Sequence, residues 1–309
     1  MENARWVISV IFFFHLCDQC SAGTWSHKAD FPASSRNNAV SFSIANKGYY
    51  GLGQKQTDIF KYKVYTDLWE YDPEKDLWTQ KSDFPAEGRL GVKGFALNRK
   101  GYAGFGYFIE AYGPNAGGND YQSDFYEFIP DSNKWCKKNN NYLADRDICF
   151  FLNDTIWSLN VDYKLLKKYD PSSDSWNEYK LGKKPPSPYY SEIIGCDADF
   201  SLNGRECIIT CMGKRKNLTN QLWEFDPYTR QWALKNNLPS SGNDTLIIFP
   251  VKQKVFALRG KNELFVYDAA SDSWVEKKET TPQKYFTPVF SIGEKSYFIS
   301  QHEFWEYEE

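Results

Sequence analysis

A short motif recurs along the chain and constrains its fold more than any other feature. Each complete copy has an aromatic residue, then a turn sequence such as Asp-Pro, and then a Trp seven residues after the aromatic. Alternating aromatic runs favour pleated strands, and Asp-Pro favours a tight turn, so each copy predicts a strand, a turn and a strand. The copies span residues 69–78, 126–135, 168–176, 223–232 and 266–274, and a sixth, incomplete copy spans 304–308.

The spacing of the motif predicts a repeat architecture. The tryptophans at the ends of the repeats lie 41 to 57 residues apart and are Trp25, Trp78, Trp135, Trp176, Trp232 and Trp274. A period near 50 residues with four short strands is typical of a β-propeller blade. The aspartates of the turns, Asp72, Asp170, Asp226 and Asp268, are interpreted as turn residues and not as a catalytic set.

The two ends of the chain each lack part of a repeat. Trp25 has no strand motif before it, and the motif at Tyr307 has no Trp after it. We therefore expect residues 24–29 to form the outer strand of the blade that ends at Glu309, which removes open sheet edges. The sequence predicts an all-β fold with six blades, closed by the N- and C-terminal strands within one blade.

Glycine-rich segments add a family resemblance. Residues 48–53 and 101–106 contain split glycine pairs before the aromatic and the Trp, and this pattern resembles the kelch repeat. Paired glycines are absent from residues 154–160, 254–260 and 295–301, where only the spacing of aromatic, turn and Trp remains. The resemblance covers residues 23–309 and implies one domain, a kelch-type β-propeller.

The N-terminal segment is expected to direct export. Residues 6–16 form an apolar stretch that is too short to span a bilayer but fits the central region of a secretory signal peptide. We expect residues 1–22 to be the signal, with cleavage after Ala22, and lipid modification of Cys17 or Cys20 is the alternative. The protein is then periplasmic, extracellular or lipid-anchored at the cell surface, with no integral membrane span once the signal is removed.

Charge and cysteine content limit the classes of partner. The net charge is −3 with both signs mixed, which argues against nucleic acid and anionic membranes as partners. Only three histidines occur, and the cysteine spacing matches no zinc site. We therefore expect no metal and no cofactor, and we expect a monomer.

A set of polar residues recurs at one register and forms the candidate site. Eleven residues after the closing tryptophans, or at the matching position of one longer connection, the chain carries Arg36, Arg89, Arg146, Tyr190, Asn243 and Tyr285. In a propeller this position lies on the rim of the central channel. Two insertions, 54–66 and 107–123, should reach the same rim and bring Tyr62, Tyr107, Glu110 and Tyr112.

This constellation allows two interpretations. Arginine binds carboxylates and phosphates in a planar, two-pronged geometry, and tyrosine faces suit sugar rings, so the rim could hold an anionic ligand. Alternatively, arginine at this position of kelch-like blades can bond backbone carbonyls of neighbouring blades and have a structural role.

Three hypotheses for the function follow. The first is a non-catalytic module that binds an extracytoplasmic protein or an acidic glycan at the rim. The second, an N-acetylneuraminate epimerase-like isomerase, rests on a resemblance to the kelch-like sialic-acid mutarotases. There, Glu110 or Asp120 would be the base, and the three arginines would hold the carboxylate. No catalytic position of that family can be matched to this sequence. The third hypothesis is a scaffold that uses an outer blade face.

Overall fold

The computed structural model describes most of the chain after residue 22. The described residues are 23–58, 61–109, 119–139, 147–153, 155–160, 165–181, 198–202, 205–214, 217–238, 246–252, 254–259, 263–279, 281–282 and 287–309. Their regular elements are β-strands and one short 3-10 helix, η1 (Pro130–Ser132). No helix in these segments is long and apolar enough to cross a membrane. The predicted signal, residues 1–22, lies outside them and stays a prediction.

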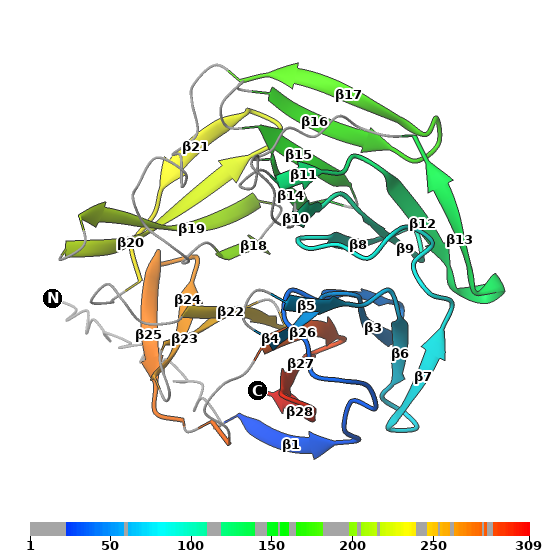
Figure 1. Ribbon diagram of the computed structural model, residues 1–309. Coiled ribbons are helices and arrows are strands. Elements are labelled where there is room, and N and C mark those ends of the chain that lie inside the picture. Colours follow the sequence, from blue (N-terminus) through cyan, green and yellow to red (C-terminus); the bar gives the residue numbers. More distant parts are fainter. Residues whose placement is uncertain are drawn as a thin grey trace, which may run out of the picture.

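The strands form six four-stranded antiparallel sheets arranged in a ring (Figure 1). Blade one contains β2 (Val40–Ile44), β3 (Lys47–Gly51), β6 (Leu68–Asp72) and β7 (Leu77–Lys81), and blade two contains β8 (Lys93–Leu97), β9 (Lys100–Gly104), β12 (Phe125–Ile129) and β13 (Lys134–Lys138). Blade three contains β14 (Asp147–Phe151), β15 (Ile156–Asn160), β16 (Leu165–Asp170) and β17 (Ser175–Lys180). Blade four contains β18 (Ala198–Leu202), β19 (Arg205–Lys214), β20 (Asn217–Asp226) and β21 (Gln231–Leu234), and blade five contains β22 (Leu246–Val251), β23 (Lys254–Arg259), β24 (Glu263–Asp268) and β25 (Ser273–Lys277).

The remaining sheet, here called the closing sheet, combines both ends of the chain. Its strands are β1 (Thr24–Lys28), β26 (Thr287–Ile292), β27 (Lys295–Ser300) and β28 (Glu303–Glu308). β1 pairs antiparallel with β28, with Trp25 opposite Tyr307, which confirms the predicted pairing of the chain ends.

The expected blade count needs a correction. If a blade is a sheet drawn from one continuous stretch of chain, the structure has five blades and not six. The sheet that contains the motif at residues 304–308 takes its outer strand, β1, from the other end of the chain. The fold is thus a kelch-like propeller of five continuous blades and one composite sheet.

Contacts between the innermost strands complete the ring. β2 contacts both β8 and β26, β14 contacts β8 and β18, and β22 contacts β18 and β26. Each sheet therefore has a neighbour on both sides.

The core aromatic of the repeated motif packs each sheet against the preceding one. Tyr71 of blade one is fully buried against Phe290 and Phe304 of the closing sheet. Phe128 of blade two packs against Tyr49 of blade one in the same way. The equivalent pairs further round the ring are Tyr169 with Tyr102, Phe225 with Phe150, and Tyr307 with Phe249. The motif that identifies the repeat thus also supplies the contacts between sheets.

The glycines of the kelch-like segments make room for these aromatic rings. A Cβ atom on Gly48 would lie 2.2 Å from the ring of Phe290, and one on Gly101 would lie 2.5 Å from the ring of Phe42. A larger residue at either position would push the neighbouring sheet away.

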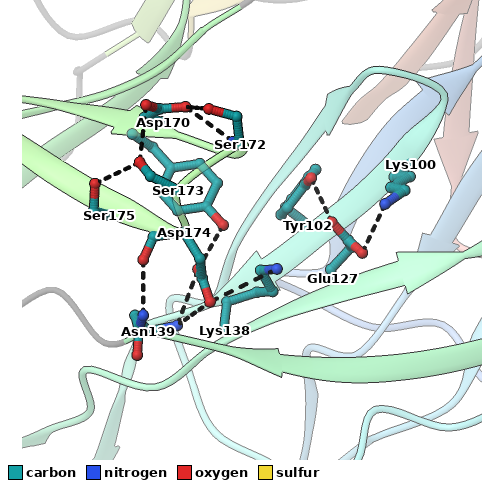
Figure 2. A network of polar contacts seen from close by, with 11 residues as sticks. Lys100, Tyr102, Glu127, Lys138, Asn139, Asp170, Ser172, Ser173, Asp174 and Ser175 are labelled. Atoms are coloured by element: carbon teal, nitrogen blue, oxygen red, sulfur yellow. Dashed lines mark hydrogen bonds and ion pairs between the residues drawn. The ribbon is translucent and has the colours of Figure 1, made fainter.

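A second repeated contact ties three of the motif turns to the preceding sheet. The hydroxyl of Tyr169 donates a hydrogen bond to Asp174 (2.8 Å), which also accepts one from the backbone N–H of Asn139 at the end of β13 (Figure 2). The same contacts join Tyr71, Asp76 and Ala29, and also Tyr267, Asp272 and Asn236. These three aspartates adopt left-handed backbone conformations, with φ of 49°. The turn aspartates predicted from the sequence bond within their turns, as Asp170 does with Ser172, but Asp72 also pairs with Lys47 of β3 at 2.7 Å. The second aspartate of these three turns was not predicted from the sequence.

Removal of β1 tests the closure of the ring. A chain of residues 31–309 loses the backbone pairing with β28 and the ring contact of Trp25 with Phe298. We expect its melting temperature to fall by about 10 °C or more relative to a chain of residues 23–309. Equal melting temperatures in calorimetry would contradict closure by β1.

Candidate functional site

Two short hairpins are inserted at equivalent points of blades one and two. The first pairs β4 (Gln54–Asp58) with β5 (Lys61–Val64), and the second pairs β10 (Tyr107–Ile109) with β11 (Asn119–Tyr121). Each begins directly after a glycine with positive φ, Gly53 at 78° and Gly106 at 87°. Both hairpins lie toward the middle of the ring in Figure 1.

The base of each hairpin is hydrogen-bonded to the connection that carries a predicted arginine. The backbones of Asn37 and Gln54 exchange two hydrogen bonds of 2.7 and 2.9 Å, and those of Leu90 and Tyr107 exchange two of 3.0 and 2.8 Å. Asn37 directly follows Arg36, and Leu90 directly follows Arg89. The structure therefore brings these two arginine positions together with the bases of the insertions, as the sequence predicts.

The connection that carries Arg89 is also hydrogen-bonded to the end of the first insertion. The backbone N–H of Phe84, in the connection that carries Arg89, donates to the carbonyl of Thr66 at the end of the first insertion (2.7 Å). We call the surface formed by hairpin β4–β5, hairpin β10–β11 and the connections around Arg36 and Arg89 the hairpin face.

Arg36 is held entirely inside blade one. Its side chain has no exposed surface, and it forms a two-pronged ion pair with Asp67, in which Nη2 donates at 2.9 Å. The guanidinium also donates to the carbonyls of Leu52 and Ser34, each at 3.1 Å. The ring of Tyr65 lies over it, 4.3 Å from the ring centroid to Cζ.

Arg89 repeats this arrangement in blade two. Its side chain is 2% exposed and forms a two-pronged ion pair with Asp124, in which Nη2 donates at 2.7 Å. Nε donates to the carbonyl of Glu87, and the rings of Phe84 and Phe108 lie beside the guanidinium. Burial alone would raise the pKa of Asp124, but the hydrogen bonds and charge of Arg89 outweigh it and hold that pKa below its usual value.

These contacts favour the structural interpretation of both arginines. Each guanidinium attaches the connection before the innermost strand to the start of the third strand of its own blade, where Asp67 and Asp124 lie. The main partner is thus a carboxylate of the same blade and not a carbonyl of a neighbouring one. A ligand could reach Arg36 or Arg89 only by displacing that carboxylate, so their predicted role in ligand binding stays a prediction.

The sequence contains a signal for these ion pairs in the spacing of the acidic residues. Asp67 and Asp124 each stand four residues before the core aromatic of their motif. In blade five, Glu263 occupies that position and forms an ion pair with Arg259. An acidic residue at this register thus accompanies an arginine in three blades, whereas Glu303 at the same register of the closing sheet accepts a hydrogen bond from the indole N–H of Trp305.

The other predicted residues that the structure describes lie in the two hairpins. Tyr62 lies in β5 and is 43% exposed, and Tyr107 is half-buried at the base of the second hairpin. Asp120 lies in β11 opposite Phe108. Six predicted positions lie outside the described residues: Arg146, Tyr190, Asn243, Tyr285, Glu110 and Tyr112.

Hairpin β4–β5 carries the exposed cations of the hairpin face, whereas the connection around Arg89 carries the exposed acidic residue Glu87. Lys55, Lys61 and Lys63 are all exposed, and among the described carboxylates only Asp58 pairs with one of them, Lys61 at 3.7 Å. The cations that an incoming anion would meet here are therefore lysines.

A separate depression lies on the outside of the ring, between blades two and three. Its volume is about 470 Å³, and it is lined by Lys137, Lys138, Asn139 and Asp174. Figure 2 shows that Lys138 and Asn139 both bond to Asp174 in the contact between the two blades. Among the described residues, no group of three or more His, Cys, Asp or Glu side chains could hold a metal ion. The hairpin face is therefore the better candidate.

Comparison with known proteins identifies the fold only. No protein-family model and no curated protein matches the chain. Among 535 matching chains of solved structures is one titled "Structure of YjhT", with a TM-score of 0.64 and 14% sequence identity. The match covers 91% of this chain and 96% of the other. The similarity supports a kelch-like β-propeller over nearly the whole chain, and at this identity it does not extend to function.

The buried ion pair of blade two yields a stability prediction. Asp124→Ala leaves the charge of Arg89 buried without its partner, and we expect a loss of about 3 kcal/mol in the free energy of unfolding. The double variant Arg89→Met/Asp124→Ala should lose less than the sum of the single variants in a denaturant titration, because no unpaired charge remains. Strict additivity would contradict the coupling.

The same pair gives a pH dependence with a defined sign. Because the folded-state pKa of Asp124 is lowered, its contribution is fully present above the unfolded-state value of about 3.9. It disappears as the pH falls through the lower, folded-state pKa. The stability difference between the wild type and Asp124→Asn should therefore shrink over this acidic range.

Proposed function

We propose that the protein is a non-catalytic binding module that holds an acidic ligand, a protein or a glycan, on the hairpin face. The observation that carries this proposal is the β4–β5 hairpin, which presents exposed lysines on a base fixed by hydrogen bonds to the ring. Insertions on a rigid scaffold are a common location for binding residues.

The local charge of the hairpin supports an acidic ligand. Residues 54–64 contain three lysines and one aspartate, a net charge of +2, in a chain whose net charge is −3. A positive patch of this kind raises the local concentration of anions and speeds their association.

The buried arginines support this function indirectly. Arg36 packs under Tyr65, which immediately follows the hairpin and whose N–H bonds to the carbonyl of Gly53 (2.9 Å). We assign Arg36 and Arg89 a positioning role, because they fix the connections to which the hairpins are attached. A base that is ordered before binding reduces the entropy lost when the ligand is bound.

The predicted export of the protein decides where its ligand would be found. If residues 1–22 are a cleaved signal, the hairpin face meets partners outside the cytoplasm, such as cell-surface proteins or acidic glycans. The propeller would then act as a single rigid support.

The alternative function is a sugar isomerase of the N-acetylneuraminate epimerase type, which the kelch-like fold accommodates. It requires an acid–base group beside an anion-binding group. Among the described residues, the carboxylates that contact Arg36 and Arg89 are the ones already paired with them, Asp67 and Asp124. Faster anomeric equilibration of freshly dissolved N-acetylneuraminate in proton NMR would favour this alternative over a binding module.

Binding of simple polyanions tests the proposal. We expect the full chain to bind polyglutamate or polygalacturonate in biolayer interferometry, more weakly as salt rises because the charges are exposed. The triple variant Lys55→Glu/Lys61→Glu/Lys63→Glu should lose at least about tenfold in affinity. Lys134→Glu/Lys137→Glu/Lys278→Glu is the matched control, with the same change in net charge on exposed residues outside the hairpin face.

Two outcomes would reject the proposed function. One is no binding of either polyanion by the wild type at low salt. The other is an equal loss in the hairpin and control variants, which would indicate attraction to overall charge without a site.

A further inference from the structure

The strand register of the first hairpin places two like charges directly opposite each other. In the β4–β5 pair, Lys55 faces Lys63. Across all cross-strand pairs of the described strands, this is the only one that joins two charges of the same sign. Like charges in directly opposite positions destabilise a β-ladder, so this pair weakens the hairpin that carries it.

No acidic side chain within the described residues relieves this repulsion. Neither lysine has a carboxylate within ion-pair distance, and Asp58, the acidic residue of the hairpin, pairs with Lys61. By contrast, Lys295 faces Glu308 and Arg259 faces Glu263 in other sheets, and both pairs form ion pairs. An anion bound between Lys55 and Lys63 would supply the missing charge.

An aromatic ring lies on the same side of the hairpin. Side chains alternate between faces along a strand, so Lys63 and Tyr65 point the same way. The ammonium of Lys63 lies 5.2 Å from the centre of the Tyr65 ring, and the buried guanidinium of Arg36 holds that ring at 4.3 Å. Lys63 therefore stands beside an aromatic ring that Arg36 fixes in place before any ligand binds.

The chemistry of this surface favours a sugar over a protein as its occupant. The described exposed side chains of the hairpin are Lys, Gln, Thr and Asp, and Tyr62 is the single exposed large hydrophobic among them. Stable protein interfaces need a cluster of apolar or aromatic anchors that lose their water on binding. A charged sugar instead offers an anionic group for the lysines, hydroxyls for the glutamines and a C–H face for the aromatic ring.

We propose that Lys55 and Lys63 form a clamp for the anionic groups of an acidic glycan, with Tyr65 against a sugar ring. This inference rests on the proposed function and narrows it in two respects: it names the class of ligand, and it names two residues of the hairpin face. Directly opposite residues have Cβ atoms about 5 Å apart, so both flexible lysines can reach one carboxylate or two neighbouring ones.

The test measures how the full chain binds several polymers, and how substitution of either of two pairs of lysines changes that binding. We expect Lys55→Gln/Lys63→Gln to bind polygalacturonate about tenfold more weakly than the wild type, because two charge-assisted hydrogen bonds are lost. Lys134→Gln/Lys137→Gln, with the same change in charge on β13, should bind like the wild type. Polyglutamate presents carboxylates without sugars, dextran sulfate presents sulfates on sugars, and neutral dextran presents neither charge.

A second variant separates binding from folding. Lys63→Glu replaces the repulsive pair with an attractive one, so we expect its melting temperature to equal or exceed that of the wild type while polygalacturonate binding falls. Weakened binding in a more stable protein would exclude unfolding as the cause. A lower melting temperature would contradict the claim that the pair is repulsive in the free protein.

The possible outcomes distinguish the glycan clamp from the broader function of an acidic-ligand module. Polyglutamate bound more tightly than polygalacturonate would overturn the glycan clamp and leave an acidic-ligand module. Equal losses in the two double-glutamine variants would overturn the clamp as a site. Absence of binding to every charged polymer would overturn both proposals. Equal binding of polygalacturonate and dextran sulfate would support a clamp for either anion.

Discussion

The structure depends on the backbone pairing of β1 with β28, because this contact ties the two ends of the chain into one sheet and so fastens the ring that the innermost strands form. Without it, β28 and the core aromatic Tyr307 would lie at an open edge, and the closing sheet would lack its fourth strand. The pairing joins segments that are 276 or more residues apart, such as Lys28 and Phe304. Closure of so long a loop costs entropy, and the ladder of paired backbone groups and the buried ring of Tyr307 offset that cost.

Within the ring, one aromatic position serves two purposes. Tyr71, Tyr169 and Tyr267 each bury their rings and donate a hydrogen bond to an aspartate five residues later. Burial satisfies the apolar ring, and the hydrogen bond satisfies the hydroxyl, so neither part is left unpaired in the core. Because the same aspartate also accepts an N–H from the preceding sheet, apolar packing and polar contacts join the same pairs of sheets.

The sequence determined much of this in advance, for physical reasons. The seven-residue spacing from Tyr71 to Trp78 is local, because both belong to one strand–turn–strand unit, and so it was readable without the fold. The closing role of residues 24–29 followed from a Trp without a motif and a motif without a Trp. The ion pair of Arg36 with Asp67 did not follow, because 31 residues separate its partners and only the fold brings them together. The motif count also led to six blades, whereas five are continuous and the last sheet is composite.

The ion pairs of the two arginines leave lysines as the cations that a ligand can reach on the hairpin face. Their register in the sequence suggests Arg36 and Arg89 as anion ligands. In the fold both are buried and paired with carboxylates, and the cations exposed to solvent are Lys55, Lys61 and Lys63. Lysine footprinting by mass spectrometry, with and without polygalacturonate, tests this account most directly. It predicts protection of Lys55 and Lys63 from acetylation while Lys134 and Lys137 stay reactive. Uniform protection, or none, would contradict it.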